Sequence, residues 1–118
     1  YKRQLRSLLH KNGFRFRLNR KDLPGKPDIV LPKFKAVIFV HGCFWHGHSC
    51  NRGHRPQTNT DFWNKKIESN IARDKKDIAL LEAQGWRVLV VWQCEIKKKN
   101  EDLLLAKIKE FLYSGNIY

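Results

Sequence analysis

The sequence of 118 residues contains no methionine, three cysteines and only 11 acidic residues. Because methionine is absent, we expect further residues before Tyr1 in a longer chain. No run approaches the roughly 18 to 20 apolar residues of a membrane-spanning helix, and no secretory signal is visible. These absences argue against a membrane-embedded or secreted protein. A chain of this length suits a single domain, residues 1–118, with one modest core.

The shortage of acids leaves a large positive charge. Lysine and arginine number 24 against 11 acids, which gives a formal net charge of +13. Such a charge on a small domain repels itself unless a polyanion is nearby. An anionic membrane surface would call for a basic helix with a wide apolar face, which the sequence lacks. Aromatic residues accompany the basic ones, so nucleic acid is favoured as a partner over a merely solvated basic surface.

Apolar spacing predicts alternating helices and strands. The expected elements, in chain order, are a helix over 3–11 closed by Gly13, a half-exposed edge strand over 14–19, a short strand over 28–31, a strand over 36–40 buried on both faces, a helix capped by Thr60 and ended by Gly85, a second buried strand over 86–92, and a helix over 101–112. The segment from Ala36 to Trp92 reads as a βαβ unit, so its two strands should be parallel.

The three cysteines are odd in number, which fits a disulfide framework poorly and a metal site in a reducing cytoplasm well. Cys43 and Cys94 each follow one strand of the predicted parallel pair, so the fold should bring them to one edge of the sheet. With His48 and Cys50 they would supply the four ligands of a structural zinc ion. His46 is a rival for the place of His48. The alternative is two loop thiols and one buried cysteine.

An acid and two histidines form a candidate hydrolytic centre. Asp28 begins one strand and His41 ends the next, and hairpin geometry should place them close together, with His46 five residues further on. Phosphodiester hydrolysis commonly uses a hard cation held by carboxylates, and an imidazole can transfer a proton near neutral pH. The alternatives are a turn-capping role for Asp28 and surface or ligand roles for the histidines.

At this point the sequence resembles a known family. The segments "LPGKPDIVL", "FVHGCFWHGHSC", "TDFWNKKIESNIARDKKD" and "GWRVLVVWQCE" are similar to those of the bacterial very short patch repair (Vsr) DNA mismatch endonucleases. The likeness covers roughly residues 3–95, and "HGCFWHGHSC" with a later "WQCE" is far more specific than "PD" alone. The resemblance implies an α/β fold of the restriction-endonuclease-like, PD-(D/E)XK type, with a mixed central sheet flanked by helices. It also implies nicking of DNA 5′ to the T of a T·G mismatch, the product of 5-methylcytosine deamination.

The resemblance also implies roles for single residues. Asp28 would bind Mg²⁺, while His41 and His46 would assist the chemistry beside it. The structural Zn²⁺ would be bound by the four ligands named above, Cys43, His48, Cys50 and Cys94. An aromatic wedge of Phe44, Trp45 and Trp63 would enter the duplex beside the mismatch. Lys66 and Asn70, two polar residues of the long helix, would contact the mismatch or the backbone. Loop packing is the alternative for Phe44 and Trp45, and a place in the core for Trp63.

Two positions depart from the family pattern. Lys2 stands where relatives usually carry a glutamate of the active centre, and a lysine there cannot hold Mg²⁺ and would repel it. Val40 stands where some relatives have threonine, although its backbone carbonyl could still serve a metal. Asp74 lies on the apolar side of the long helix. The only partners that the sequence suggests for it are Arg73 and a neighbouring lysine.

The expected function is therefore a Mg²⁺-dependent mismatch-nicking endonuclease with a structural zinc. The expected partners are double-stranded DNA with a T·G mismatch and mismatch-repair proteins, for a monomer at the bacterial nucleoid in the cytoplasm. A rival from another class is a zinc-stabilised mismatch-binding module with impaired or no catalysis, which Lys2 keeps open. A second rival is a restriction-type nuclease with another target, which would cut a matched duplex equally well.

Overall fold

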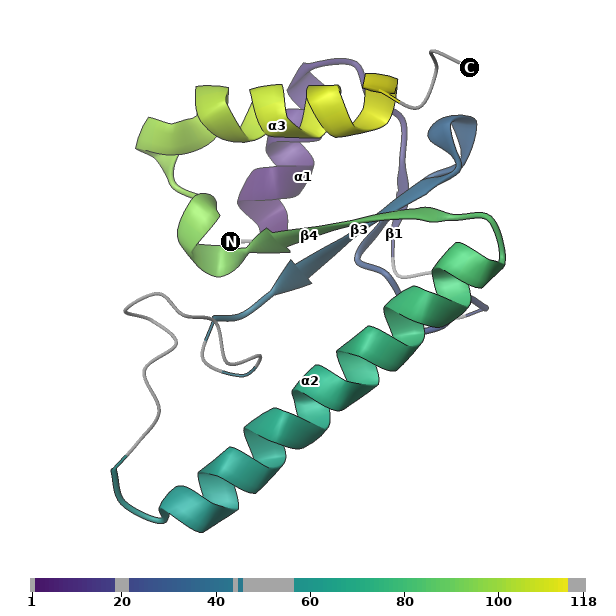
Figure 1. Ribbon diagram of the computed structural model, residues 1–118. Helices are drawn as coiled ribbons and strands as arrows, with labels where there is room; N and C mark the ends of the chain where they lie inside the picture. The colour runs from purple at the N-terminus through teal and green to yellow at the C-terminus, as the bar shows by residue number, and fades with distance from the viewer. Residues whose placement is uncertain (1, 19–21, 44, 46–56, 115–118) are drawn as a thin grey trace.

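The computed structural model describes residues 2–18, 22–43, 45 and 57–114, which form a four-stranded sheet with helices on both faces (Figure 1). In chain order the helices and strands are α1 (Lys2–Lys11), β1 (Arg17–Leu18), β2 (Ile29–Leu31), β3 (Ala36–His41), α2 (Thr60–Ala83), β4 (Arg87–Trp92) and α3 (Glu101–Ser114). This order confirms the predicted sequence of elements and the α/β class.

The sheet is mixed, with strand order β1-β2-β3-β4. The β1–β2 and β2–β3 pairs are antiparallel, whereas β3 and β4 are parallel, with Val40 opposite Val91 and His41 opposite Trp92. Helix α2 makes the crossover that a parallel pair requires. The predicted βαβ unit is confirmed, and β3 and β4 end at the same edge of the sheet.

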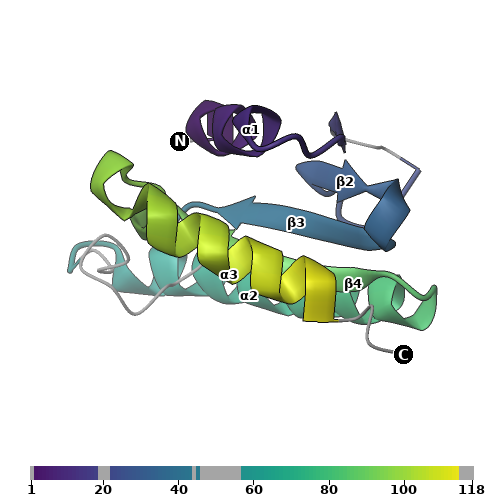
Figure 2. The same cartoon turned by 90° about the horizontal axis from the view of Figure 1, so that it is seen from above.

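Two apolar clusters hold the layers together. The larger packs α1 and α3 on one face of the sheet, and the smaller packs α2 on the other. Figure 2 shows α3 in front of β4, with α2 behind it. Side chains of β3 alternate between the clusters, as a strand requires: Ala36, Ile38 and Val40 face α1 and α3, and Val37 and Phe39 face α2. By the same alternation His41 belongs to the α2 side.

Two strand predictions need correction. The edge strand was expected from Phe14, but β1 covers Arg17–Leu18 alone, because Phe14 is buried against Phe34 and Tyr113. Strand β4 was expected to be buried throughout, yet only Val91 is buried and its other residues are partly exposed. Among the described strands β4 lies at an edge of the sheet, so one side has no strand neighbour.

Helix α2 also differs from expectation at its start. Its N-cap is Asn59 rather than Thr60, with a left-handed φ of 51° and no capping bond from the side chain. Asp61 in the first turn complements the positive end of the helix dipole. With 24 residues α2 is about 36 Å long, whereas a strand of six residues spans about 20 Å. Its N-terminal part therefore extends past the sheet (Figure 1).

The other helix boundaries follow the predictions. Gly13 and Gly85 follow α1 and α2 with φ of 80° and 89°, the left-handed conformation common just after a helix C-terminus. Among the helices of the described residues, none is both long and apolar enough to cross a membrane.

Candidate active site

A cavity of about 480 Å³ opens where β2 begins and β3 ends. Asp28 and His41 both line it, so the predicted hairpin brings the acid and the imidazole to one place. The charged residues of its wall come from four parts of the chain, namely Lys2 of α1, Lys26 and Asp28 of the segment before β2, His41 of β3, and Arg73, Asp74 and Asp77 of α2.

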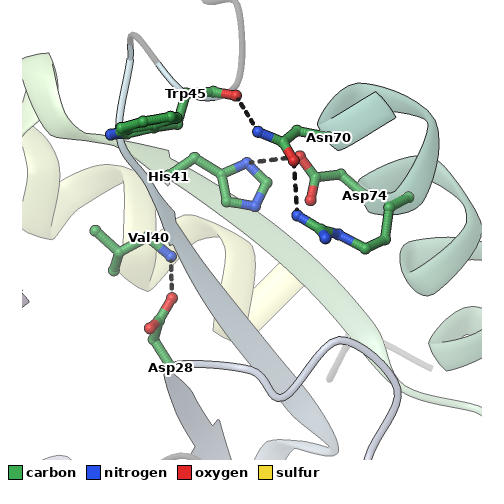
Figure 3. A network of polar contacts seen from close by, with 7 residues as sticks. Asp28, Val40, His41, Trp45, Asn70 and Asp74 are labelled. Atoms are coloured by element: carbon green, nitrogen blue, oxygen red, sulfur yellow. Dashed lines mark hydrogen bonds and ion pairs between the residues drawn. The ribbon is translucent and has the colours of Figure 1, made fainter. Parts of the chain in front are cut away.

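The carboxylate of Asp28 is buried and both of its oxygens have partners. Oδ2 accepts a hydrogen bond of 2.7 Å from the backbone N–H of Val40 (Figure 3). Oδ1 lies 2.9 Å from the Nζ atom of Lys2, in the first turn of α1. A buried carboxylate needs such partners, because removing the charge from water without them would cost several kcal/mol.

The imidazole of His41 is buried and held from three sides. Its ring lies edge-on to Trp92 with centroids 5.3 Å apart, and 5.7 Å from the ring of Phe39. Its Nδ1 atom lies 4.0 Å from Oδ2 of Asp74, a distance longer than a hydrogen bond but close enough for a charge to act (Figure 3). The surroundings therefore fix the ring plane and favour a proton on Nδ1.

The structure accounts for the position of Asp74 on the apolar side of its helix. It sits on the inward side of α2, half-buried, and faces a residue of β3 more than thirty positions earlier in the chain. Sequence reasoning assigned it no role, although an acid on the inner side of a helix is itself a sign of a polar partner on the sheet.

The turn before β2 fits closely against α2. Gly25 has a φ of 73°, and a Cβ atom added there would lie 2.9 Å from the Cβ of Asp77. Only glycine meets both requirements at low cost. This contact fixes the turn, and hence the position at which Asp28 enters the sheet.

Beyond the end of the sheet, aromatic and polar side chains gather over α2. The rings of Trp45 and Trp63 are 5.9 Å apart, and Nζ of Lys66 lies 5.3 Å above Trp45. The amide of Asn70 donates a hydrogen bond of 2.9 Å to the backbone oxygen of Trp45 (Figure 3). Four of the five residues expected to bind DNA thus lie together. Trp63 is absent from both core clusters, so the alternative of a core residue is not met.

Phe62 extends this aromatic group and was not singled out from the sequence. It is 59% exposed, its ring lies 5.2 Å from Trp63, and Nζ of Lys66 is 6.0 Å away. The signal available in the sequence was a second large aromatic residue directly before Trp63, at the predicted start of the helix. Large apolar side chains are informative when they cluster at the surface.

Two of the predicted zinc ligands lie where the parallel strands end. Cys43 and Cys94 each follow the register pair His41–Trp92 by two residues, and Cys43 is fully buried. Glu95 fixes the turn that carries Cys94, because its carboxylate accepts the N–H of Trp92 at 2.9 Å and pairs with Lys107 at 2.7 Å. The expectation that one edge gathers both cysteines agrees with this register.

Four predicted site residues lie outside the described residues, namely Phe44, His46, His48 and Cys50. The described thiols Cys43 and Cys94 are soft donors of the kind zinc prefers, and they fit two places of a structural site. Magnesium fits less well. The one carboxylate proposed for Mg²⁺ is already paired with an ammonium, which repels a divalent cation.

Comparison with known proteins bears directly on this site. A family profile described as DNA mismatch endonuclease Vsr matches residues 2–52. The chain is 62% identical over 92 residues to the type II nicking enzyme V.XorIIP of Xanthomonas oryzae pv. oryzae, a match that spans 78% of this chain and 68% of that enzyme. It is 42% identical over 113 residues to the DNA mismatch endonuclease Vsr of Escherichia coli, spanning 93% of this chain and 72% of that protein.

A basic α/β protein with these relatives is, by class, a DNA endonuclease. More narrowly, the chain belongs to the Vsr family. Its matched segment 2–52 includes Lys2, Asp28 and His41 of the cavity wall, whereas the wall residues of α2 lie beyond the part that the family profile covers.

Proposed function

We propose that the protein nicks double-stranded DNA on the 5′ side of the T in a T·G mismatch and so starts very short patch repair. The observation that carries this proposal is the meeting of Asp28 and His41 in one cavity, beside an aromatic and basic group that could open a base step. The 42% identity to a DNA mismatch endonuclease supports the choice of substrate, and the charge of +13 suits a polyanion.

In this proposal His41 is the group that moves a proton. Hydrolysis joins a water oxygen to phosphorus and breaks one P–O bond, so the water must lose a proton and the leaving oxygen must gain one. Asp74 lies 4.0 Å from Nδ1, where its charge would stabilise a protonated imidazole, and the packing of Trp92 holds the ring in place. His46 would share this work, in a part of the chain outside the described residues.

The described residues fit the proposed Zn²⁺ better than the proposed Mg²⁺. Zn²⁺ held by Cys43, Cys94, His48 and Cys50 would brace the loop after β3, and the two described ligands suit it. Mg²⁺ at Asp28 would lower the charge of the scissile phosphate, but the ammonium of Lys2 lies on that carboxylate. We therefore assign no step to Mg²⁺.

The aromatic group is the proposed reader of the mismatch. Opening a base step costs a few kcal/mol, and stacking on aromatic rings returns much of that cost. A T·G wobble opens more easily than a Watson–Crick pair, which favours the mismatched site. Trp45 is 46% exposed and stands beside Trp63, so both rings are available to insert with Phe44, while Lys66 and Asn70 are placed to contact the backbone or the bases.

Two observations each favour another function. The Lys2–Asp28 ion pair favours a mismatch-binding module with impaired catalysis, because it removes a metal ligand from service. Relatives named as type II nicking enzymes, such as V.XorIIP and the 57% identical V.NmeAIP of Neisseria meningitidis, favour nicking at a target that the mismatch alone does not define.

A nicking assay on matched substrates separates these functions. We would incubate the protein with Mg²⁺ and with end-labelled duplexes that differ only in one pair, T·G or T·A, and vary the flanking bases. The proposed function predicts a nick 5′ to the T of T·G and no nick in T·A. Asp28→Ala should lose at least about 100-fold of the rate, because Asp28 holds the backbone of Val40 and so positions the adjacent His41. The matched control is Asp102→Ala, an exposed acid of α3.

Equal cutting of T·G and T·A would favour the restriction-type nuclease. Binding of T·G without cleavage would favour the binding module, and equal cutting by Asp28→Ala would remove Asp28 from the centre. Elemental analysis of the purified protein tests the zinc proposal separately, since it predicts bound zinc that is lost in Cys94→Ser.

A further inference from the structure

An ion pair between Lys2 and Asp28 lies in the wall of the cavity. The ammonium lies 2.9 Å from Oδ1, and the other oxygen accepts the backbone N–H of Val40 at 2.7 Å. The carboxylate is therefore already neutralised by a cation that belongs to the chain. A divalent ion that approached Oδ1 would meet the positive charge of Lys2 at the same atom, and two cations repel at this distance.

The other side chains near Asp28 do not complete a site for a divalent cation. Hard divalent cations take six or more oxygen ligands, several of them carboxylates or carbonyls. The other two acids of the wall, Asp74 and Asp77, come from α2, and Asp74 faces His41. One carboxylate shared with an ammonium is a better site for the ammonium than for a divalent ion.

We infer that Lys2 is the resident counter-cation of Asp28, so that the protein binds DNA without a divalent ion and a metal must displace Lys2 to reach Asp28. The inference rests on the proposed function only in placing the DNA phosphate at this cavity. Lys2 balances the charge of Asp28 while DNA binds, before any bond is hydrolysed.

The charges around the cavity explain why the resident cation matters for DNA binding. Three basic and three acidic side chains line it, with His41 in addition. A glutamate in place of Lys2 would leave two basic side chains against four acidic ones, and a phosphate would then be repelled unless a metal ion entered. With Lys2 in place the wall is balanced, and the surrounding charge of +13 attracts the duplex.

Lys2 is also able to withdraw. Its side chain is 46% exposed and comes from the first residue of α1, where the helix has no acid in its first turn. The positive end of a helix dipole disfavours an ammonium there, so Asp28 is what holds it inward. A swing into solvent therefore opens Oδ1 without rearranging the sheet.

The test compares wild type, Lys2→Glu and Lys2→Met in two measurements that need no cleavage. Fluorescence anisotropy with a labelled T·G duplex gives the Kd without divalent ions and with added Ca²⁺. We expect the wild-type Kd to change less than about threefold, and Lys2→Glu to bind about tenfold more weakly without Ca²⁺ and to recover with it. Electron paramagnetic resonance with Mn²⁺ should show at least about tenfold tighter ion binding in Lys2→Glu than in wild type.

Two controls make these outcomes specific. Lys11→Glu carries the same charge change at the far end of α1 and should leave Mn²⁺ binding unchanged. Lys2→Met removes the cation without adding an acid, so it should bind Mn²⁺ more tightly than wild type and less tightly than Lys2→Glu, with circular dichroism checking that each variant is folded. If the Lys2→Glu variant is unfolded, the Lys2→Met comparison decides.

Wild-type DNA binding that requires a divalent ion would overturn the inference, as would equal Mn²⁺ affinity in wild type, Lys2→Met and Lys2→Glu. These results are independent of nicking. A protein that binds as expected yet never nicks T·G would refute the proposed function and leave the role of Lys2 standing.

Discussion

The two ends of the β2–β3 hairpin carry cavities of similar size and opposite character. At one end, a cavity of about 480 Å³ is lined by equal numbers of acidic and basic side chains, together with His41. At the other end, about 500 Å³ is lined by Phe14, Phe16, Phe34 and Tyr113 with three basic side chains, and its described wall holds no acid. The first lies against the end of β3 and the residue before β2, and the second against the turn Pro32–Phe34 that joins the two strands, so the flanking elements contribute different side chains to each.

The aromatic end is organised for stability. Phe34 and Tyr113 stack edge to face at 5.5 Å. Beside them the guanidinium of Arg87 donates hydrogen bonds to the backbone oxygens of Phe111, Leu112 and Phe34, at 2.6, 3.0 and 3.2 Å. A single cation thus ties the C-terminal end of α3, whose carbonyls lack helical partners, to the start of β4.

The polar end pairs each of its key groups with a different element. Asp28 is held by Lys2 of α1, and His41 faces Asp74 of α2. All four of these side chains line the cavity, so a change at any one of them alters the charge of its wall. Cavities of similar size therefore serve chemistry at one end and stability at the other, and variants at the two ends should affect different measurements.

The largest expected effect is at the polar end. His41→Ala should lower the nicking rate on a T·G duplex by about 100- to 10,000-fold, because a positioned proton-transfer group is lost. Single-turnover kinetics measures it, and thermal unfolding reports how much stability the buried ring contributes. His10→Ala, an exposed histidine near the other end of α1, should keep the wild-type rate. A rate within a few-fold of wild type in His41→Ala would remove this residue from the chemistry.

A smaller effect is expected at the aromatic end. Arg87→Met should lower the free energy of unfolding by about 2–3 kcal/mol, because three carbonyl groups lose a charged donor. Urea unfolding measures it, and the nicking rate per folded molecule should stay unchanged. Arg15→Met, which replaces an exposed arginine that lines the aromatic cavity, is the control and should shift the free energy by less than about 0.5 kcal/mol. Loss of nicking without loss of stability would contradict the division between the ends.

The smallest effect concerns discrimination. Trp45→Ala should weaken binding to the T·G duplex by about tenfold, the loss expected for one stacked base, and should alter binding to a matched duplex much less. Anisotropy titrations on both duplexes measure the ratio. Tyr113→Ala removes an aromatic ring of similar exposure at the opposite end and should leave the ratio unchanged. An equal loss of affinity on both duplexes would make Trp45 a general DNA contact instead of a mismatch reader.

Much of the fold could be predicted because it depends on local pattern. The apolar run of Ala36 to Val40 and the long amphipathic helix after Thr60 fix a parallel βαβ unit, and this unit brings Cys43 and Cys94 to one edge. The partial exposure of β4 could not be predicted, because whether a strand is central or at an edge depends on the order of strands in space and leaves no mark on its apolar run.

The sequence alone determined the family, the parallel βαβ unit and the meeting of Asp28 with His41, because motif spacing and hydropathy period are properties of the chain itself. Only the tertiary structure decided which charged side chains lie opposite each other. It turned Asp74 toward His41 and set the ammonium of Lys2 on Asp28. Such pairings join residues more than twenty positions apart, and their energy comes from shared burial, which no local pattern encodes.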